Sequence, residues 1–517
     1  MNKKFFTNLM CFVLIISMLL TGCGDGGATD SSFAGDKTEK RDTVTVVEKA
    51  DLPTLDPIAT PDRRIPLFQI YDTLVIDDSK SENGVAPALA ESWDISDDAK
   101  EIVFHIRKDV KFHNGEPLTA EDVAFSINTS IESPFTTQLT SSMESAEVVD
   151  DNTVLVNLKF AYNPAIRCFS CPELSIINKK AYEDDPIAYG REPIGTGPYV
   201  LKEWVSGDKL ILEAFPDYYR GEASIKNLVY KIIGDASTAL IALEKGEVDV
   251  LVNPDPSSRQ SIIDNEDFAF YECNAYANNS IAFNNSRGIF SNPKVREAVS
   301  YAIDKDAIIL GAKEGMATRV ECAVVPGYTG YPENFKGHPY DPEKAKQLLA
   351  EAGYPDGFTV KMKTIDSEIY KKPTEIIQEQ LRKIGIDVEI DVMARSKWVE
   401  DVLTNGDYDI TFWATIGIVD DADFCLYSQF HSSNMGGNGN FSECNIPELD
   451  DLLERGRASV DENERKEIYA KACEIIRDNN VILPIYLPYR QIATNKDLEG
   501  ITVNAALKIY SYGWSWK

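Results

Sequence analysis

An apolar run stands at the beginning of this chain, and no later segment is apolar enough to span a bilayer. Lys3 and Lys4 precede the run, which extends from Leu9 to Leu20, and Thr21-Gly22-Cys23 follows it. A basic start, a short apolar stretch and small residues before a cleavage point are typical of an export signal. The run is marginal in length for a membrane span. We therefore expect a body that folds as a soluble unit outside the cytoplasm.

The end of this segment resembles the lipobox of bacterial lipoproteins. The resemblance implies that residues 1–22 are a lipoprotein signal peptide and that Cys23 is diacylated and becomes the first residue. Two acyl chains hold a protein stably on a membrane without a spanning helix. Residues 23–42 are rich in Gly, Ser, Thr and Asp and predict a flexible tether. A plain cleaved signal peptide or a short anchor helix is the alternative. We expect a lipid-anchored protein on the extracytoplasmic face of the cell membrane.

Length and charge limit what the body can be. At about 150 residues per domain, 517 residues allow roughly three domain-sized units. Lysine and arginine number 52 against 83 aspartates and glutamates, a net charge of -31, which repels phosphate backbones and argues against nucleic acid as a partner. The acidity serves solubility or, alternatively, attracts cationic ligands.

Cysteine and histidine do not form a metal-site pattern. Cys168 and Cys171 have CxxC spacing, but a second such pair and a nearby histidine are both missing. Cys168 and Cys171 either form a local disulfide or remain ordinary buried thiols. The alternative is a redox or metal-binding role for this pair. The four histidines stand singly along the chain, so we expect no resident metal and no cofactor.

Strand and helix signals alternate along the body. Thr43 to Val47 predicts a strand, and turn residues before Leu155 and Leu210 predict antiparallel hairpins. Residues 342–352 predict a helix with Asp341 as its N-cap, and residues 374–384 predict a second helix followed by a strand over 386–390. Repeated helix–strand pairs favour an α/β lobe. The β-type tail suggests that the chain returns to the first lobe.

Several longer motifs carry a resemblance to a known family. They are Leu89-Ala90-Glu91-Ser92-Trp93, Val110 through Val123, Pro193 through Tyr199, Pro216 through Gly221, Ala242 through Asp249, Val295 through Lys305 and Tyr340 through Tyr354. Within the second of these, Asn114-Gly115 predicts a tight turn, and Thr119 with Asp122 predicts a helix N-cap. Over residues 43–500 the chain resembles the solute-binding proteins of peptide and nickel ABC importers, extracellular family 5.

The resemblance implies an α/β, two-lobed, periplasmic-binding-protein-like fold of the class II type, with an extra β-rich subdomain in the first lobe. It places lobe I at residues 43–283, the subdomain at about 91–190, lobe II at 284–480 and the return to lobe I at 481–517. It also implies a monomer that closes on a small solute and docks on a permease and ATPase complex. The resemblance implies no enzymatic reaction in this chain.

Two tryptophans are the leading candidates for ligand contact. In peptide-binding relatives, tryptophans at the positions of Trp413 and Trp398 line the cavity, although either residue can instead belong to the core. Those relatives carry an aspartate three residues beyond the first tryptophan, where it pairs with the α-ammonium group of the ligand. This chain has Ile416 at that place. The departure puts ordinary peptide recognition in question.

Other polar residues are weaker candidates. Asp420, Asp421 and Asp423 could replace the missing aspartate, or they could cap a helix that begins near Phe424. Across the predicted cleft, the candidates are Thr60, Arg63, Tyr486 and Tyr489, and Arg63 is either a carboxylate partner or a solvated surface residue.

The prediction from the sequence is therefore a receptor subunit that captures an oligopeptide or dipeptide. The alternative within the same fold is a non-peptide solute such as a metal chelate, an oligosaccharide or an opine. A hydrolase is disfavoured because Gly195-Thr196-Gly197 is not a nucleophile elbow. A signalling or adhesion module would fit the anchor and tether equally well.

Overall fold

Strand β1 (Thr43–Glu48) lies inside a mixed sheet, as its β-branched residues predict. It pairs in parallel with β10 (Asn227–Ile232) and β11 (Val250–Val252). Beyond β10, the strands β9 (Lys209–Ala214) and β8 (Tyr199–Val205) continue the sheet as an antiparallel hairpin, which confirms the strand predicted at Leu210.

This computed structural model describes residues 41–60, 65–78, 81, 84–436 and 439–517, and residues 42–517 form one compact unit.

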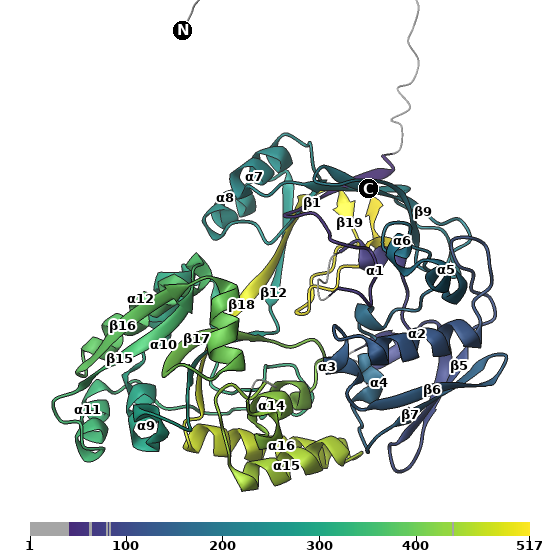
Figure 1. Cartoon of the computed structure of the whole chain (residues 1–517). Helices are drawn as coiled ribbons and strands as arrows, with labels where there is room; N and C mark the ends of the chain where they lie inside the picture. Colours follow the sequence, from purple (N-terminus) through teal and green to yellow (C-terminus); the bar gives the residue numbers. More distant parts are fainter. Residues whose placement is uncertain (1–40, 61–64, 79–80, 82–83, 437–438) are drawn as a thin grey trace, which may run out of the picture. The chain divides into compact units, whose positions relative to one another are not determined.

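The long strand β18 (Ile482–Asn495) connects two groups of strands (Figure 1, yellow). Its second half pairs with β12 (Phe268–Asn274) and β11, and its first half pairs with β13 (Ala277–Phe283) and β14 (Ala317–Arg319). The strand order is therefore β16 (Ile386–Met393), β15 (Phe358–Ile365), β17 (Ile410–Ile416), β13, β18, β11, β1, β10, β9 and β8. The chain passes from one group to the other between β12 and β13, and it returns within β18. The lobe boundaries at 283 and 481 stay predictions, although these crossings agree with a two-lobed chain.

The second group of strands is covered by helices. Strand β15 (Phe358–Ile365) pairs in parallel with β16 (Ile386–Met393) and with β17 (Ile410–Ile416). Helix α11 (Pro342–Glu351) begins after Asp341, whose side chain accepts a hydrogen bond from Lys344, as predicted. Helix α12 (Glu368–Arg382) begins six residues earlier than predicted and contains Pro373. The earlier start brings Tyr370 into the helix, and that residue reaches the candidate site.

A separate four-stranded antiparallel sheet has the order β4 (Ala90–Ile95), β5 (Glu101–Ile106), β7 (Thr153–Leu158) and β6 (Met143–Asp150). Helix α2 (Ala120–Glu132) packs against β6 and β7, and the core that they form also includes Ile418, Val419 and Phe424. Its N-terminus has the predicted capping box, in which Thr119 accepts from the Asp122 N–H and Asp122 accepts from the Thr119 N–H. Gly115 has a φ of +84°, as the predicted turn requires.

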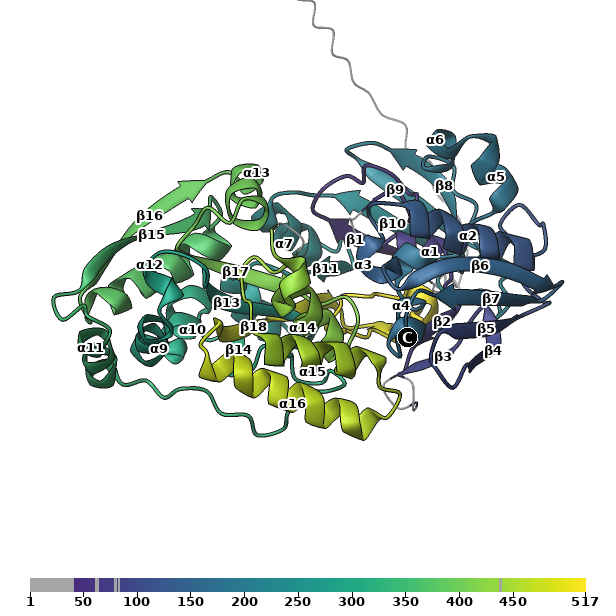
Figure 2. The ribbon, with the colours of Figure 1, turned by 60° about the horizontal axis from the view of Figure 1, so that its bottom comes forward.

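Three helices after β17 pack together: α14 (Ala422–Phe430), α15 (Pro447–Ala458) and α16 (Glu462–Asp478) (Figure 2). The remaining strands and helices are α1 (Leu67–Ile70), β2 (Val75–Asp77), β3 (Val85–Pro87), α3 (Thr137–Thr140), α4 (Ala165–Cys168), α5 (Lys179–Asp184), α6 (Pro186–Tyr189), α7 (Ala236–Glu244), α8 (Arg259–Ile263), α9 (Pro293–Ala302), α10 (Lys305–Lys313), α13 (Arg395–Trp398), β19 (Leu498–Glu499) and β20 (Ser515–Trp516). Within the described ranges, none of the helices combines the length and apolarity that a bilayer span needs.

The predicted signal segment 1–22, Cys23 and residues 24–40 of the predicted tether lie outside the described residues. Arg63, which the sequence placed near the opening of the cleft, also lies outside them.

Candidate functional site

Two aromatic rings stack on Trp413, which lies on β17. The Trp398 ring centroid is 4.4 Å from that of Trp413 with an interplanar angle of 24°, and the Tyr370 centroid is 5.7 Å away with an angle of 11°. The Trp398 indole N–H donates to the Thr411 hydroxyl at 3.1 Å. Stacked aromatic pairs at these separations favour a fixed ring orientation. We call Trp398, Trp413 and Tyr370 the aromatic cluster.

The members of the aromatic cluster differ in exposure. Trp398 exposes 0% of its surface, whereas Trp413 and Tyr370 are only half-buried. Trp413 and Tyr370 can therefore offer a surface to a ligand, and Trp398 supports Trp413 from the core side. Through the family resemblance, the sequence named Trp413 and Trp398 as candidates for the cavity lining, but it did not predict that their rings stack. It missed Tyr370 because the predicted start of its helix, at Thr374, left that residue outside.

The predicted rim residues lie in different surroundings. Tyr486 on β18 is fully buried against Phe412, with ring centroids 6.0 Å apart, and its hydroxyl has no hydrogen-bond partner among the described residues. Burial raises the pKa of this phenol above its usual range. Tyr489 is half-buried opposite Asn274, and Thr60 is buried. Ile416, in contrast, is 57% exposed at the end of β17.

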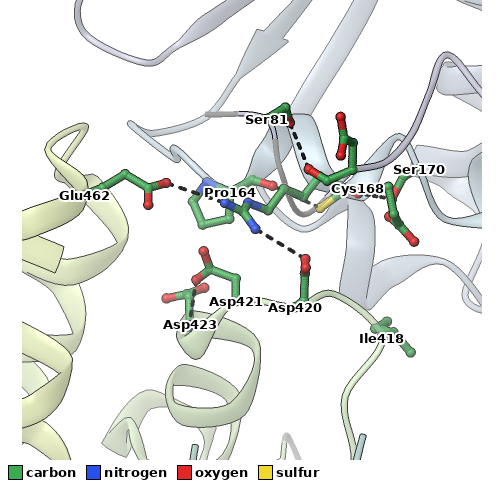
Figure 3. Close-up of polar contacts among 12 residues, drawn as sticks. Ser81, Pro164, Cys168, Ser170, Ile418, Asp420, Asp421, Asp423 and Glu462 are labelled. Carbon is green, nitrogen blue, oxygen red and sulfur yellow. Dashed lines mark hydrogen bonds and ion pairs between the residues drawn. The ribbon is translucent and has the colours of Figure 1, made fainter. Parts of the chain in front are cut away.

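The three aspartates after β17 lie together at the start of α14 (Figure 3). Asp421 is the N-cap of this helix, because its side chain accepts from the Asp423 N–H at 2.9 Å. The capping interpretation therefore holds for Asp421, and the helix begins at Ala422 rather than near Phe424. Asp421 also accepts from a fully buried arginine, Arg465, at 2.7 Å.

The neighbours of Asp421 also pair with arginines of the chain. Asp423 accepts from Tyr162 at 3.0 Å and from Arg457 at 3.2 Å. Asp420 accepts from Arg167 at 3.3 Å, and the same guanidinium donates to Glu462 at 3.4 Å (Figure 3). Each of these acids therefore already has an arginine partner within the chain, and a ligand ammonium group would share a carboxylate with that arginine or displace it.

Burial dominates the electrostatics of this loop. It raises the pKa of Asp420 above the usual range, and the charge of Arg167 opposes that shift. Burial likewise raises the pKa of Asp423 against the charge of Arg457. For Arg465, burial is the largest single influence and alone would lower the pKa, but the charge of Asp421 and those of its neighbours together raise it. The guanidinium groups thus keep the acids of a dry loop compensated.

Metal ligands and reactive thiols do not gather in the described part of the chain. It contains no group of three or more histidine, cysteine and carboxylate side chains placed to hold a metal ion. Cys168 and Cys171 are buried thiols, and burial raises the pKa of Cys168 well above its usual range. A thiol of raised pKa is a poor nucleophile near neutral pH.

The α/β fold, the strand exchange through β18 and the half-buried rings of the aromatic cluster agree with a solute-binding protein. Residues 84–437 match the bacterial extracellular solute-binding proteins of family 5, and the chain belongs to this family. It is thus an extracytoplasmic solute-binding protein of the kind that serves ABC importers.

Relatives with assigned ligands share most of the chain. Heme-binding protein A of Haemophilus influenzae is 31% identical over 454 residues, which are 81% of each chain. The dipeptide-binding protein of Escherichia coli is 28% identical over 81% of this chain and 84% of its own. The structure of AgaA from A. tumefaciens R10 in complex with agropinic acid has a TM-score of 0.76 and 28% identity, over 92% of this chain and 99% of AgaA.

Proposed function

We propose that this protein captures an oligopeptide or dipeptide outside the cytoplasm and delivers it to an ABC permease and its ATPase as a monomeric receptor. The aromatic cluster is the observation that carries this proposal, because two half-buried rings held by a buried third ring offer a rigid apolar wall. The similarity to a dipeptide-binding protein supports the peptide class.

Calorimetry with a mixed pool of di- to pentapeptides tests this proposal. We expect the full-length protein to bind part of the pool and Trp413→Ala to weaken binding at least tenfold, because the wall loses its central ring. Trp204→Ala is the matched control, since Trp204 is also half-buried but lies on β8 under Arg191, whose guanidinium carbon is 4.0 Å from the ring centroid. If no peptide binds the unchanged protein, the peptide proposal is wrong.

A non-peptide solute is the second candidate, and Ile416 is the observation that favours it. An exposed isoleucine stands where peptide-binding relatives carry the aspartate that meets the ligand's ammonium group. Relatives of comparable similarity are a heme-binding protein and a protein in complex with agropinic acid. Mass spectrometry of the solutes that copurify with the protein distinguishes a peptide from a metal chelate, an oligosaccharide or an opine.

Lipid anchoring through Cys23 completes the proposal. The residues before Cys23 resemble a lipobox, and the predicted tether would give the body reach above the membrane. We expect metabolic labelling with palmitate to mark the protein in the membrane fraction and Cys23→Ala to abolish the label. Label that persists in the variant would contradict anchoring through this residue.

We also propose that the protein catalyses no reaction. The residues Gly195 and Gly197 serve packing, because a Cβ atom at either position would lie 2.0 Å or 2.5 Å from backbone oxygens of Ile70 and Gln69. His431 does contact Ser433 and Glu454, but its Nδ1 accepts the Ser433 backbone N–H at 3.1 Å, as an N-cap does. Ester hydrolysis that Ser433→Ala abolishes would overturn this proposal.

A further inference from the structure

Three buried cysteines meet around residues 320–330, the segment that follows β14. Cys322 belongs to this segment, Cys425 to α14 and Cys473 to α16, and each exposes 3% of its surface or less. All three are thiols in this structure, and they belong to one apolar core cluster. We call these three residues the thiol cluster.

Packing around Gly330 brings two of the helices onto this segment. A Cβ atom at Gly330 would lie 2.8 Å from the Tyr469 ring and 2.9 Å from the Ala422 Cβ atom, so the segment lies between α14 and α16. On α14, Cys425 follows Ala422 by three residues, and on α16, Cys473 follows Tyr469 by four. Such spacings place residues on the same face of a helix. Both thiols therefore face the segment after β14.

The contacts of the thiols agree with this packing. The Cys473 thiol forms a hydrogen bond with the Cys322 thiol and contacts the backbone of Val324. The Cys425 thiol contacts the backbone of Val325, so it meets the same segment from α14. Within the thiol cluster, Cys322 and Cys473 are thus the pair whose sulfur atoms are in direct contact.

The chain is fixed on both sides of this pair, and space remains beside it. The Asn278 side-chain amide donates to the Cys322 carbonyl at 2.9 Å, and Cys473 lies inside a continuous helix. A cavity of about 20 Å³ adjoins the pair, and its lining includes Cys473 together with Glu321 and Ala323. The cavity gives the two side chains room to rotate toward the geometry of a disulfide.

We propose that Cys322 and Cys473 form a disulfide when the protein folds outside the cytoplasm. The two thiols lose two protons and two electrons to a disulfide oxidant, R–S–S–R, which leaves as two thiols, and one sulfur–sulfur bond forms in the chain. Family 5 proteins are extracellular, and disulfides form and persist in oxidising compartments of that kind. Cys425, the third member of the thiol cluster, stays a thiol. The bond joins the segment after β14 to α16.

Burial determines when this bond forms. It raises the pKa of the Cys473 thiol well above the usual range, so the folded protein contains little of the thiolate that thiol–disulfide exchange requires. The exchange therefore takes place before α16 packs onto the segment. Once the protein is folded, the bond is inaccessible to a reductant in solution.

Peptide mapping of the full-length protein after export tests the proposal. The protein is denatured in an excess of an alkylating reagent without any reductant, and its proteolytic digest is analysed by mass spectrometry. We expect one linked pair of peptides that contains Cys322 and Cys473 and that disappears on reduction. The peptide that contains Cys425 should carry the alkyl label.

Thermal unfolding distinguishes a bond from simple packing of thiols. We expect the exported protein to have a Tm at least about 5 °C above that of protein refolded in reductant, because the bond closes a long loop of the chain. Cys322→Ala and Cys473→Ala should each abolish this difference. Cys444→Ala is the matched control and should retain it, because Cys444 is equally buried in the same core cluster but has Asp450 and Arg296 as its charged neighbours.

The linked pair of Cys322 and Cys473 supports the proposal even where a single variant fails to fold. Alkylation of both cysteines in protein that was never reduced, or a linked pair that contains Cys425, would overturn it. A dependence of the Tm on reductant that persists in Cys473→Ala would overturn it as well. None of these outcomes depends on which solute the protein binds, so this proposal and the proposed function can fail separately.

Discussion

At the scale of single residues, His113 shows how burial fixes a protonation state. Its Nε2 lies 3.0 Å from the Gly197 carbonyl oxygen, and its Nδ1 lies 3.3 Å from the Gly195 nitrogen. A ring that donates through Nε2 and accepts through Nδ1 is neutral. Burial lowers the pKa of His113 from 6.5 to about 4. The neutral ring thus holds the turn formed by Gly195, Thr196 and Gly197.

This histidine predicts an acid-sensitive stability. Between about pH 6.5 and pH 4 the unfolded chain binds a proton at His113 that the folded protein does not bind, so the free energy of unfolding falls as the pH falls through this range. The loss from this one group is at most about 3 kcal/mol. Denaturant unfolding of the wild type and His113→Gln between pH 4 and pH 8 measures it.

His105→Gln is the control for this experiment, since His105 is exposed and faces Asp94. We expect the slope of stability against pH over this range to become smaller in His113→Gln and to persist in His105→Gln. An unchanged slope in His113→Gln would show that the histidine does not titrate as the buried geometry requires.

At the scale of elements, the start of α14 combines a helix cap with a buried ion pair. Asp421 caps the helix and pairs with Arg465, and both side chains are almost fully buried. Arg465 also donates to the Gly456 carbonyl, so one guanidinium connects α14, α15 and α16. Removing one member of a buried pair leaves an uncompensated charge.

We therefore predict that Asp421→Asn lowers the free energy of unfolding by about 3–5 kcal/mol even though asparagine can still cap a helix. The double variant Asp421→Asn, Arg465→Met should recover part of that loss, because the buried guanidinium is gone. Urea unfolding at neutral pH measures these values. Asp461→Ala at the start of α16 is the control, where an exposed cap that forms no ion pair with the described residues should cost about 1 kcal/mol. If Asp421→Asn and Asp461→Ala lower the free energy of unfolding by similar amounts, the ion pair between Asp421 and Arg465 contributes nothing to stability.

The same loop shows which parts of the site the sequence could predict. Three aspartates stand close together before an apolar stretch, so a helix start was predictable. The family resemblance named Trp398 and Trp413 as candidates, but the stacking of their rings was not predicted. The choice of Asp421 as cap was not predictable, because all three acids are good caps and the arginine that decides between them follows 44 residues later.

At the scale of the whole molecule, the order of the elements was more predictable than their pairings. Periodicity and capping residues predicted β1, the hairpin at Leu210, and α11, and the family resemblance predicted the α/β class. Local patterns could not show that β18 exchanges partners between two groups of strands, because neither its apolar first half nor its mixed polar and apolar second half indicates which strands it pairs with. Such pairing joins segments that are far apart in sequence, for example Ala282 with Ile482 and Ala317 with Pro488.

One long-range contact predicts how the parts of the body are held together. Arg167 on α4, next to the four-stranded sheet, donates to Asp420 before α14 and to Glu462 on α16 (Figure 3). Only 8% of its side chain is exposed. Because its acceptors are charged and partly dry, we predict that Arg167→Gln lowers the free energy of unfolding by about 1–3 kcal/mol.

The effect of Arg167→Gln should also be local, and hydrogen exchange tests this. We expect faster amide exchange in residues 160–171 and 418–424 and unchanged exchange in β15 and β16, which do not contact this arginine. Arg287→Gln is the control, because Arg287 pairs with Asp407 at an exposed position where an ion pair contributes about 0.5 kcal/mol or less. Uniformly faster exchange in Arg167→Gln would mean that the arginine stabilises the entire fold. Unchanged exchange in both segments would mean that the tyrosine contact to Asp423 and the packing around it hold these parts together without the arginine.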